Sequence, residues 1–249
     1  MNGNWDFLAT STKNAGVTLE MGGILTTTGS NVAGTLFVGI VNGASCFSAL
    51  QPIPVTGTIS NSGSVSVASS AINNQIITVT GNLTSGGSSV TGATYSVSSG
   101  NTSQASCAAG DQGKVAASIA FPLSSVYTGS ITSQLNGDVY LVTVNLTEQT
   151  YSFNSAPYLT LSGQISVTGS SCFSKATLAP GVTINGQVDN IVFGNELAFI
   201  VPIGSTTSFA QNLVVVGNIT QGGSMLQGTY AFGGGQCGDD TGVATLNAQ

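Results

Sequence analysis

The chain contains an internal repeat, and this repeat fixes the number and size of its domains. The hexapeptide GASCFS at 43–48 returns as GSSCFS at 169–174. Further along, GNLTSGGSSVTGATY at 81–95 returns as GNITQGGSMLQGTY at 217–230, and CAAGDQG at 107–113 returns as CGDDTG at 237–242. Each copy spans about 120 residues, the size of a domain rather than of a solenoid repeat. The sequence therefore predicts two tandem homologous domains, 1–119 and 120–249, joined near Pro122.

Each copy is a succession of short stretches in which apolar and polar residues alternate, such as ITVT at 77–80 and VTVNL at 142–146. Alternation with a period of two gives a strand one buried face and one solvated face. Short connections such as NSGS at 61–64 and SGGS at 85–88 favour hairpins, so that neighbouring strands pair antiparallel. The first copy contains about eight such strands in a meander.

An all-β meander of eight strands with one apolar face can close into an up-and-down barrel or fold into a two-sheet β-sandwich. Closure removes the exposed edges of the sheet. Glycines recur within the strands, as tight barrel bends require; they are Gly22, Gly23, Gly34, Gly57, Gly81 and Gly92. We therefore expect two tandem eight-stranded antiparallel barrels, with the sandwich as the alternative.

The charge of the chain is unusually low and restricts its partners. Charged residues make up 5% of the sequence, histidine and arginine are absent, and the net charge is −6. Nucleic-acid binding needs clustered cations, and three scattered lysines (Lys13, Lys114 and Lys175) cannot supply them. No stretch approaches eighteen consecutive apolar residues, so the sequence predicts no transmembrane segment.

The four cysteines are distributed evenly between the two copies. Each copy has one in its SCFS segment and one shortly before an Asp and a Gly. Of the three pairings that four cysteines allow, only Cys46 with Cys107 and Cys172 with Cys237 places the same bridge inside each domain. Without histidine or a CxxC motif, a zinc site is disfavoured. We therefore predict two intradomain disulfides and no metal.

Disulfides and low charge together favour an extracytoplasmic protein. The N-terminal segment MNGNWDF has neither the basic nor the apolar region of a signal peptide. We expect that a signal segment has been removed and that Met1 was introduced for expression.

The chemistry-bearing residues give no strong indication of an enzyme. Without histidine, no Ser-His or Cys-His arrangement can form. The carboxylates that could act in a pair are Asp6, Glu20, Asp111, Asp138, Glu148, Asp189 and Glu196. Among them only the Asp after the second Cys recurs between the copies. We expect these acids to be solubilising surface charges, and Asp111, Asp239 and Asp240 to form Asx turns rather than a calcium site.

The segments YTGSIT, GSSCFS, GNITQGGSMLQGTY and CGDDTGVATL resemble uncharacterised β-rich domains of secreted and lipid-anchored acidobacterial proteins. The resemblance covers nearly the whole chain, best from Gly163 to Leu246, and implies export without a known activity. The opening GNW, followed by a Gly-Thr-rich meander, is similar in layout to avidin and lipocalin barrels. That second likeness concerns the fold alone.

These observations lead to one hypothesis and one alternative. The hypothesis is a non-enzymatic extracytoplasmic surface or ligand-binding module without a cofactor, which takes a small apolar molecule or a glycan. An apolar pocket inside a barrel would be the binding site if the barrel is not filled by its own side chains. The alternative is a structural subunit that self-associates into an extracellular filament or envelope layer.

Overall fold

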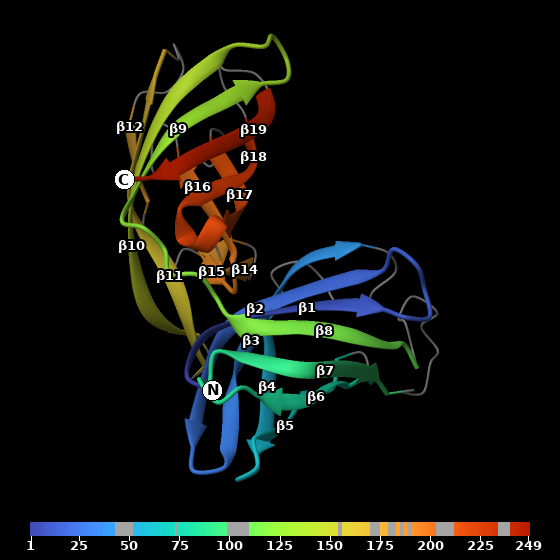
Figure 1. The fold of residues 1–249 in the computed structure, drawn as a ribbon. Helices are drawn as coiled ribbons and strands as arrows, with labels where there is room; N and C mark the ends of the chain where they lie inside the picture. The colour runs from blue at the N-terminus through green and yellow to red at the C-terminus, as the bar shows by residue number, and fades with distance from the viewer. Residues whose placement is uncertain are drawn as a thin grey trace. The chain divides into compact units, whose positions relative to one another are not determined.

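The computed structural model describes residues 1–42, 52–72, 74–98, 110–153, 156–169, 175–178, 183–184, 187–188, 191–202, 212–233 and 240–249. The chain divides into two compact units (Figure 1). One unit holds Met1–Ala120 with Ser152–Tyr158, and the other holds Phe121–Tyr151 with Leu159–Gln249. Each unit is built on a closed antiparallel barrel of eight strands, called barrel 1 and barrel 2 below. The predicted barrel is confirmed, and the sandwich alternative is not adopted.

Barrel 1 is a simple meander in which each strand pairs with the next and β8 closes onto β1. Its strands are β1 (Gly3–Ser11), β2 (Thr18–Thr28), β3 (Asn31–Asn42), β4 (Pro52–Ile59), β5 (Ser64–Ser69), β6 (Ile77–Leu83), β7 (Ser89–Val97) and β8 (Gln112–Ile119). The alternation read from the sequence is realised directly: in β8, Val115 and Ala117 are buried while Lys114 and Ala116 are exposed.

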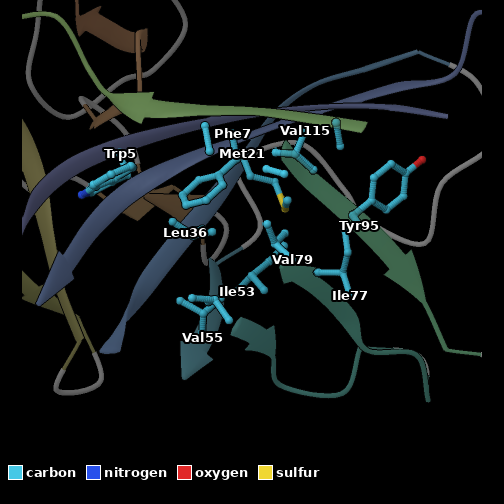
Figure 2. Packing of buried hydrophobic residues seen from close by; sticks show 14 of the residues in the cluster. Trp5, Phe7, Met21, Leu36, Ile53, Val55, Ile77, Val79, Tyr95 and Val115 are labelled. Atoms are coloured by element: carbon cyan, nitrogen blue, oxygen red, sulfur yellow. The ribbon is translucent and has the colours of Figure 1, made fainter. Parts of the chain in front are cut away.

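Buried side chains from all eight strands pack together in the interior of barrel 1. Figure 2 shows buried residues from β1 to β8 converging on one cluster, with Trp5 and Tyr95 at its opposite ends. Trp5 and Phe7 pack with their ring centroids 6.1 Å apart. An eight-stranded barrel is just wide enough for side chains to fill. The described interior residues therefore form a hydrophobic core, and an apolar ligand pocket inside a barrel stays a prediction.

Barrel 2 repeats the meander with added short strands. Its elements are β9 (Val126–Ser133), β10 (Val139–Phe153), β11 (Ala156–Thr168), β12 (Lys175–Leu178), β15 (Ile191–Phe193), β16 (Glu196–Pro202), β17 (Asn212–Thr220), the short 3-10 helix η1 (Gln221–Gly223), β18 (Met225–Gly233) and β19 (Asp240–Ala248). β11 pairs with β10, β12 and β15, and β19 closes onto β9. β13 (Thr183–Ile184) and β14 (Gln187–Val188) form a separate two-stranded ladder.

The two barrels have the same pairing register at the seam where the last strand closes onto the first. Ser11 of β1 lies opposite Gly113 of β8, and Ser133 of β9 lies opposite Gly242 of β19. This register places Trp5 and Tyr127 at equivalent positions, and both are fully buried. The sequence repeat is therefore a structural repeat, and each residue of the seam in barrel 1 has a counterpart in barrel 2.

Candidate functional site: a polar groove beside a repeated buried latch

A buried carboxylate joins three strands at one rim of barrel 1. Asp111, directly before β8, is 4% exposed. Its Oδ1 accepts a hydrogen bond from Ser11 Oγ at 2.6 Å, and its Oδ2 accepts one from Tyr95 OH at 2.7 Å. Because both oxygens have donors, the carboxylate is buried at low cost. We call Ser11, Tyr95 and Asp111 the rim latch of barrel 1.

Barrel 2 contains the same latch. Ser133 Oγ donates to Asp240 Oδ1 at 2.8 Å, and Tyr230 OH donates to Asp240 Oδ2 at 3.0 Å. All three side chains are buried. Ser-Tyr-Asp in the same geometry at equivalent positions of both barrels is therefore a property of the repeated fold.

The latch also holds the hairpin turn that follows its serine. Ser11 Oγ accepts hydrogen bonds from the backbone N–H groups of Lys13 (3.1 Å) and Asn14 (2.9 Å). Ser133 Oγ accepts from Leu135 (3.1 Å) and Asn136 (3.2 Å) in the same way. Each serine hydroxyl donates one hydrogen bond to the carboxylate and accepts two from backbone N–H groups, so its hydrogen-bonding capacity is used in full. The arrangement stabilises a rim and leaves no free hydroxyl for attack on a substrate.

A glycine next to each latch makes room for the tyrosine ring. A Cβ on Gly113 would lie 2.7 Å from Tyr95 Cε1 and would collide with the Thr10 carbonyl oxygen. A Cβ on Gly242 would lie 2.6 Å from Tyr230 Cε1 and would collide with the Thr132 carbonyl oxygen. In the Asp-x-Gly segment that recurs after each second Cys, the Asp thus supplies the carboxylate that accepts the tyrosine hydrogen bond, and the Gly leaves space for the tyrosine ring.

The structure corrects the sequence-based interpretation of three acids, of which two belong to the latches. Asp111 and Asp240 were expected to lie in surface turns and to bond their own backbone, but their carboxylates are buried and accept hydrogen bonds from side chains of other strands. Glu196, expected to be a surface charge, is 2% exposed. In the first two cases local turn chemistry was outweighed by donors far away in the sequence: Ser11 lies 100 residues from Asp111, and Ser133 lies 107 residues from Asp240.

Both latch tyrosines have raised pKa values. Burial is the main cause of the raised pKa of Tyr95, followed by its hydrogen bond to Asp111 and the negative charge of that carboxylate. The pKa of Tyr230 is raised by burial first and then by Asp240 in the same two ways. Ionising either phenol would place two negative charges together in a buried site.

On the outer face of barrel 1, next to the latch, a groove of about 420 Å³ crosses β6, β7 and β8. Its lining is rich in hydroxyl groups; the lining residues are Thr12, Thr78, Thr80, Thr94, Tyr95, Ser96, Gln112, Gly113 and Lys114. The outward side chains form cross-strand rows, in which Thr80 pairs with Thr94 and Thr94 with Lys114. The hydroxyls of Thr80 and Thr94 lie 3.4 Å apart. The volume falls within the usual range for ligand sites.

The groove begins at Thr94, directly after the point where β7 has one residue more than its counterpart in barrel 2. The segment VTGATY of β7 corresponds to LQGTY of β18, so Ala93 is the additional residue. The pairing register of β7 shifts against β6 between Thr80 and Asn82, and against β8 between Val90 and Thr94. A bulge bends its strand and increases the local twist. In barrel 2 the registers of β17–β18 and β18–β19 run without a shift.

The equivalent outer face of barrel 2 has different chemistry. Its row reads Val216–Thr229–Val243–Thr132–Val139 across β17, β18, β19, β9 and β10. The barrel 1 row reads Thr80–Thr94–Lys114–Thr10–Thr18. Val216, Val243 and Val139 are 44%, 48% and 59% exposed. Valine thus replaces two threonines and the lysine.

The remaining predicted site residues are not gathered into one site. The four cysteines (Cys46, Cys107, Cys172 and Cys237), Asp189 and Asp239 lie outside the described residues, so the disulfide pairing remains a prediction. Asp138 and Glu148 are exposed, and Asp6 and Glu20 are half-buried on different strands. Among the described residues, no three cysteine, aspartate or glutamate side chains are grouped so that they could hold a metal. In that same part of the chain, no helix has the length and apolar character needed to span a membrane.

Sequence reasoning missed the latch serines and the groove. The segments GNWDFLATS at 3–11 and SVYTGSITS at 125–133 align with each other and end in Ser11 and Ser133. The recurrence of the serines was therefore visible in the sequence, but their hydrogen bonds to Asp111 and Asp240 were not. The groove could have been found from the Ala93 insertion together with the exchange of Lys114 for Val243.

Comparisons with known proteins were made against family models, curated proteins and solved structures. The chain matches no family model, no curated protein and no solved structure. The geometry of the two barrels is therefore the basis for a functional proposal.

Proposed function

We propose that the chain is a non-enzymatic, extracytoplasmic ligand-binding module, and that its first barrel binds a polar ligand in the groove across β6, β7 and β8. The observation that carries the proposal is the difference between the barrels. Both barrels share the antiparallel meander, yet β7 has a residue that β18 lacks, and the outward row beside the groove has hydroxyls and Lys114 where the equivalent row of barrel 2 has valines. A feature that the fold does not require needs another reason, and ligand binding supplies one.

The position of the groove favours binding to side chains rather than to a strand edge. Every strand of barrel 1 is paired on both sides, so a peptide cannot add itself as a further strand. The lining offers hydroxyl, amide and ammonium groups on rigid strands. Such groups bind a molecule that has its own hydroxyls, and this favours the glycan over the apolar ligand expected as an alternative.

Extracytoplasmic location is part of the proposal. It rests on the low charge and on the cysteine pair in each copy, which would form the same crosslink twice. The resemblance to secreted acidobacterial domains is consistent with it.

The test fills the groove and uses barrel 2 as the matched control. Thr94→Trp places a large ring in the groove, and Thr229→Trp places the same ring at the equivalent position of barrel 2. Binding is measured on an oligosaccharide array and then by calorimetry. We expect Thr94→Trp to lose at least tenfold in affinity and Thr229→Trp to bind like the wild type. Equal binding by both variants would place the site elsewhere, and absence of binding by the wild type to any sugar would overturn a glycan-binding groove.

A second candidate, self-association as a structural subunit, has one observation in its favour. Val216, Val243 and Val139 form an exposed apolar row on barrel 2, with Thr229 and Thr132 between them. Apolar side chains grouped on an outer sheet face are typical of interfaces. Sedimentation velocity of the wild type and of the Val216→Thr, Val243→Lys variant decides this candidate. A monomeric wild type at high concentration would exclude it, and assembly abolished in the variant would support it.

A further inference from the structure

The groove lining contains one charged group, and that group has no partner among the residues that the structure describes. Lys114 is the only ionisable side chain of the lining apart from the buried phenol of Tyr95. Its side chain is exposed and forms no hydrogen bond or ion pair with the described residues. Lys13, by contrast, donates its ammonium to the Gly110 carbonyl. In a chain with three lysines and a net charge of −6, an unpaired ammonium within a groove is a specific feature.

The neighbours of Lys114 leave its ammonium available to a ligand. In its cross-strand row it stands between Thr94 and Thr10, which are both exposed threonines. No carboxylate belongs to the groove lining, and Asp111 on the inner side is committed to Ser11 and Tyr95. The row equivalent in barrel 2 places Val243 at this position, so the strand does not need a lysine to pair.

We infer that the ligand of the groove is an acidic glycan, whose carboxylate binds the Lys114 ammonium while its hydroxyls bond to the surrounding Thr and Ser side chains. This inference rests on the proposed function and adds its ligand class. Threonine and serine hydroxyls both donate and accept, as sugar hydroxyls do. Thr80, Thr94 and Ser96 lie on adjacent strands beside the ammonium and present such hydroxyls on one surface.

Two other classes of anion fit the groove less well. A nucleic acid needs several cations to neutralise successive phosphates, and the groove supplies one. A phosphate group favours a bidentate arginine or a nest of backbone N–H groups, whereas the strand N–H groups here are used in the sheet ladder. A sugar chain with widely spaced carboxylates needs only a single cation together with many neutral donors and acceptors.

The test uses pairs of oligosaccharides that differ only in charge. The probes are hexasaccharides of galacturonate, glucuronate and mannuronate, each as the free acid and as its methyl ester. Affinities are measured by calorimetry at low salt for the full chain, for Lys114→Gln, and for Lys175→Gln on β12 of barrel 2, which changes the net charge equally. We expect at least one acid to bind about two- to fivefold more tightly than its ester, because one exposed ion pair contributes modestly.

The variants distinguish a failure of the acidic-ligand inference from a failure of the proposed glycan-binding function. Lys114→Gln should bind acid and ester equally, whereas Lys175→Gln should keep the preference for the acid. Added salt should reduce acid binding to the wild type and leave ester binding unchanged. Equal affinity of the wild type for acid and ester, with both lost in Thr94→Trp, would refute the acidic ligand and keep the groove as a glycan site. If no probe binds, this inference fails, whereas the proposed function fails only if the wild type also binds no neutral sugar on the array.

Discussion

Barrel 1 and barrel 2 are alike on the inside of their closing seam and different on the outside. The latch, Ser11-Tyr95-Asp111 in one and Ser133-Tyr230-Asp240 in the other, has the same donors and acceptors. On the outer face of the same strands, positions that carry hydroxyls and Lys114 in barrel 1 carry valines in barrel 2. Side chains that point inward must fit a packed interior, whereas side chains that point outward can differ between the copies without disturbing that packing. The inner match therefore reflects the shared fold, and the outer mismatch is the basis of the proposed ligand site.

The largest loss of stability should come from reducing the predicted disulfides. Mapping these bonds tests whether both copies contain the same one. β3 ends at the rim of barrel 1 where β8 begins, because Asn42 lies opposite Thr18 and Ser11 lies opposite Gly113. In the sequence, Cys46 follows the first of these strand ends and Cys107 precedes the second. Non-reducing peptide mapping should show Cys46 joined to Cys107 and Cys172 joined to Cys237. Reduction should lower the stability of each barrel by about 4 kcal/mol, as expected for loops of this length.

A bond between Cys46 and Cys172 would contradict that prediction and would mean that the copies interlock. Four free thiols in protein taken from its native compartment would remove the argument for export. The control is the double variant Cys46→Ser, Cys107→Ser. If the pairing is correct, it should lower the stability of barrel 1 alone.

Removing the latch carboxylate should come next in size. Asp111→Ala leaves the buried hydroxyls of Ser11 and Tyr95 without their acceptor, and we expect a loss of about 3 kcal/mol in the free energy of unfolding of barrel 1. Trp5, the only tryptophan, lies in the barrel 1 core, so its fluorescence in urea reports that barrel. Asp240→Ala should destabilise barrel 2 by a similar amount and leave the Trp5 transition in place.

The matched control for both variants is the exposed Asp138, whose replacement by alanine should cost less than 1 kcal/mol. A loss of less than 1 kcal/mol for Asp111→Ala would show that the latch is incidental to stability. A large loss in one barrel and none in the other would show that the latch has different roles in the two copies.

Alkaline pH should weaken both barrels through the latch tyrosines. Their pKa values in the folded chain lie above the ordinary value of 10.0, so their contribution to stability is complete below pH 10 and is lost as the pH rises. Between pH 8 and pH 11 each tyrosine should reduce the free energy of unfolding by roughly 1 kcal/mol. Urea unfolding at each pH, compared with Tyr95→Phe and Tyr230→Phe, isolates this effect. The Phe variants should show the shallower decline, and equal slopes in all three proteins would disprove the coupling.

The sequence predicted the fold in detail because the fold depends on local patterns that occur twice. Period-two alternation, hairpin turns and strand glycines specify an antiparallel meander, and the repeat specifies two of them. The latch depends on contacts between residues far apart in the chain, such as Ser11 and Asp111, which no local pattern reveals. Asp111 was therefore placed in a surface turn.

The groove was missed for a different reason. Its residues, Thr78, Thr80, Thr94 and Ser96, are the ordinary outward residues of a half-buried strand, and only their alignment with barrel 2 makes them unusual. The signal was the one-residue difference between VTGATY and LQGTY, which is small in the sequence but shifts the register of a whole strand.

Deleting Ala93 should make β7 resemble β18. We expect the registers of β6–β7 and β7–β8 to become continuous, and binding of any groove ligand to fall by at least tenfold. The stability of barrel 1 should change by no more than about 1 kcal/mol, because barrel 2 shows that the strand pairs without the additional residue. Cross-strand backbone NOEs between Gly81 and Gly92, which should pair only in the continuous register as Gly217 and Gly228 do, check the register. A variant that keeps the register shift and the binding would show that the bulge has another origin.

The smallest effect on stability should come from exchanging the outer faces. Thr80→Val with Lys114→Val gives barrel 1 the outward residues of barrel 2, and Val216→Thr with Val243→Lys does the reverse. Each pair should change the free energy of unfolding by less than about 0.5 kcal/mol, because these side chains are exposed on strands that accept both residue types. Thermal melts of both variants measure this change, and calorimetry with the acidic oligosaccharides measures binding. If the exchange in barrel 1 destabilises it by more than 2 kcal/mol, the hydroxyl face serves the fold. If stability is unchanged and binding is lost, that face is maintained for its ligand.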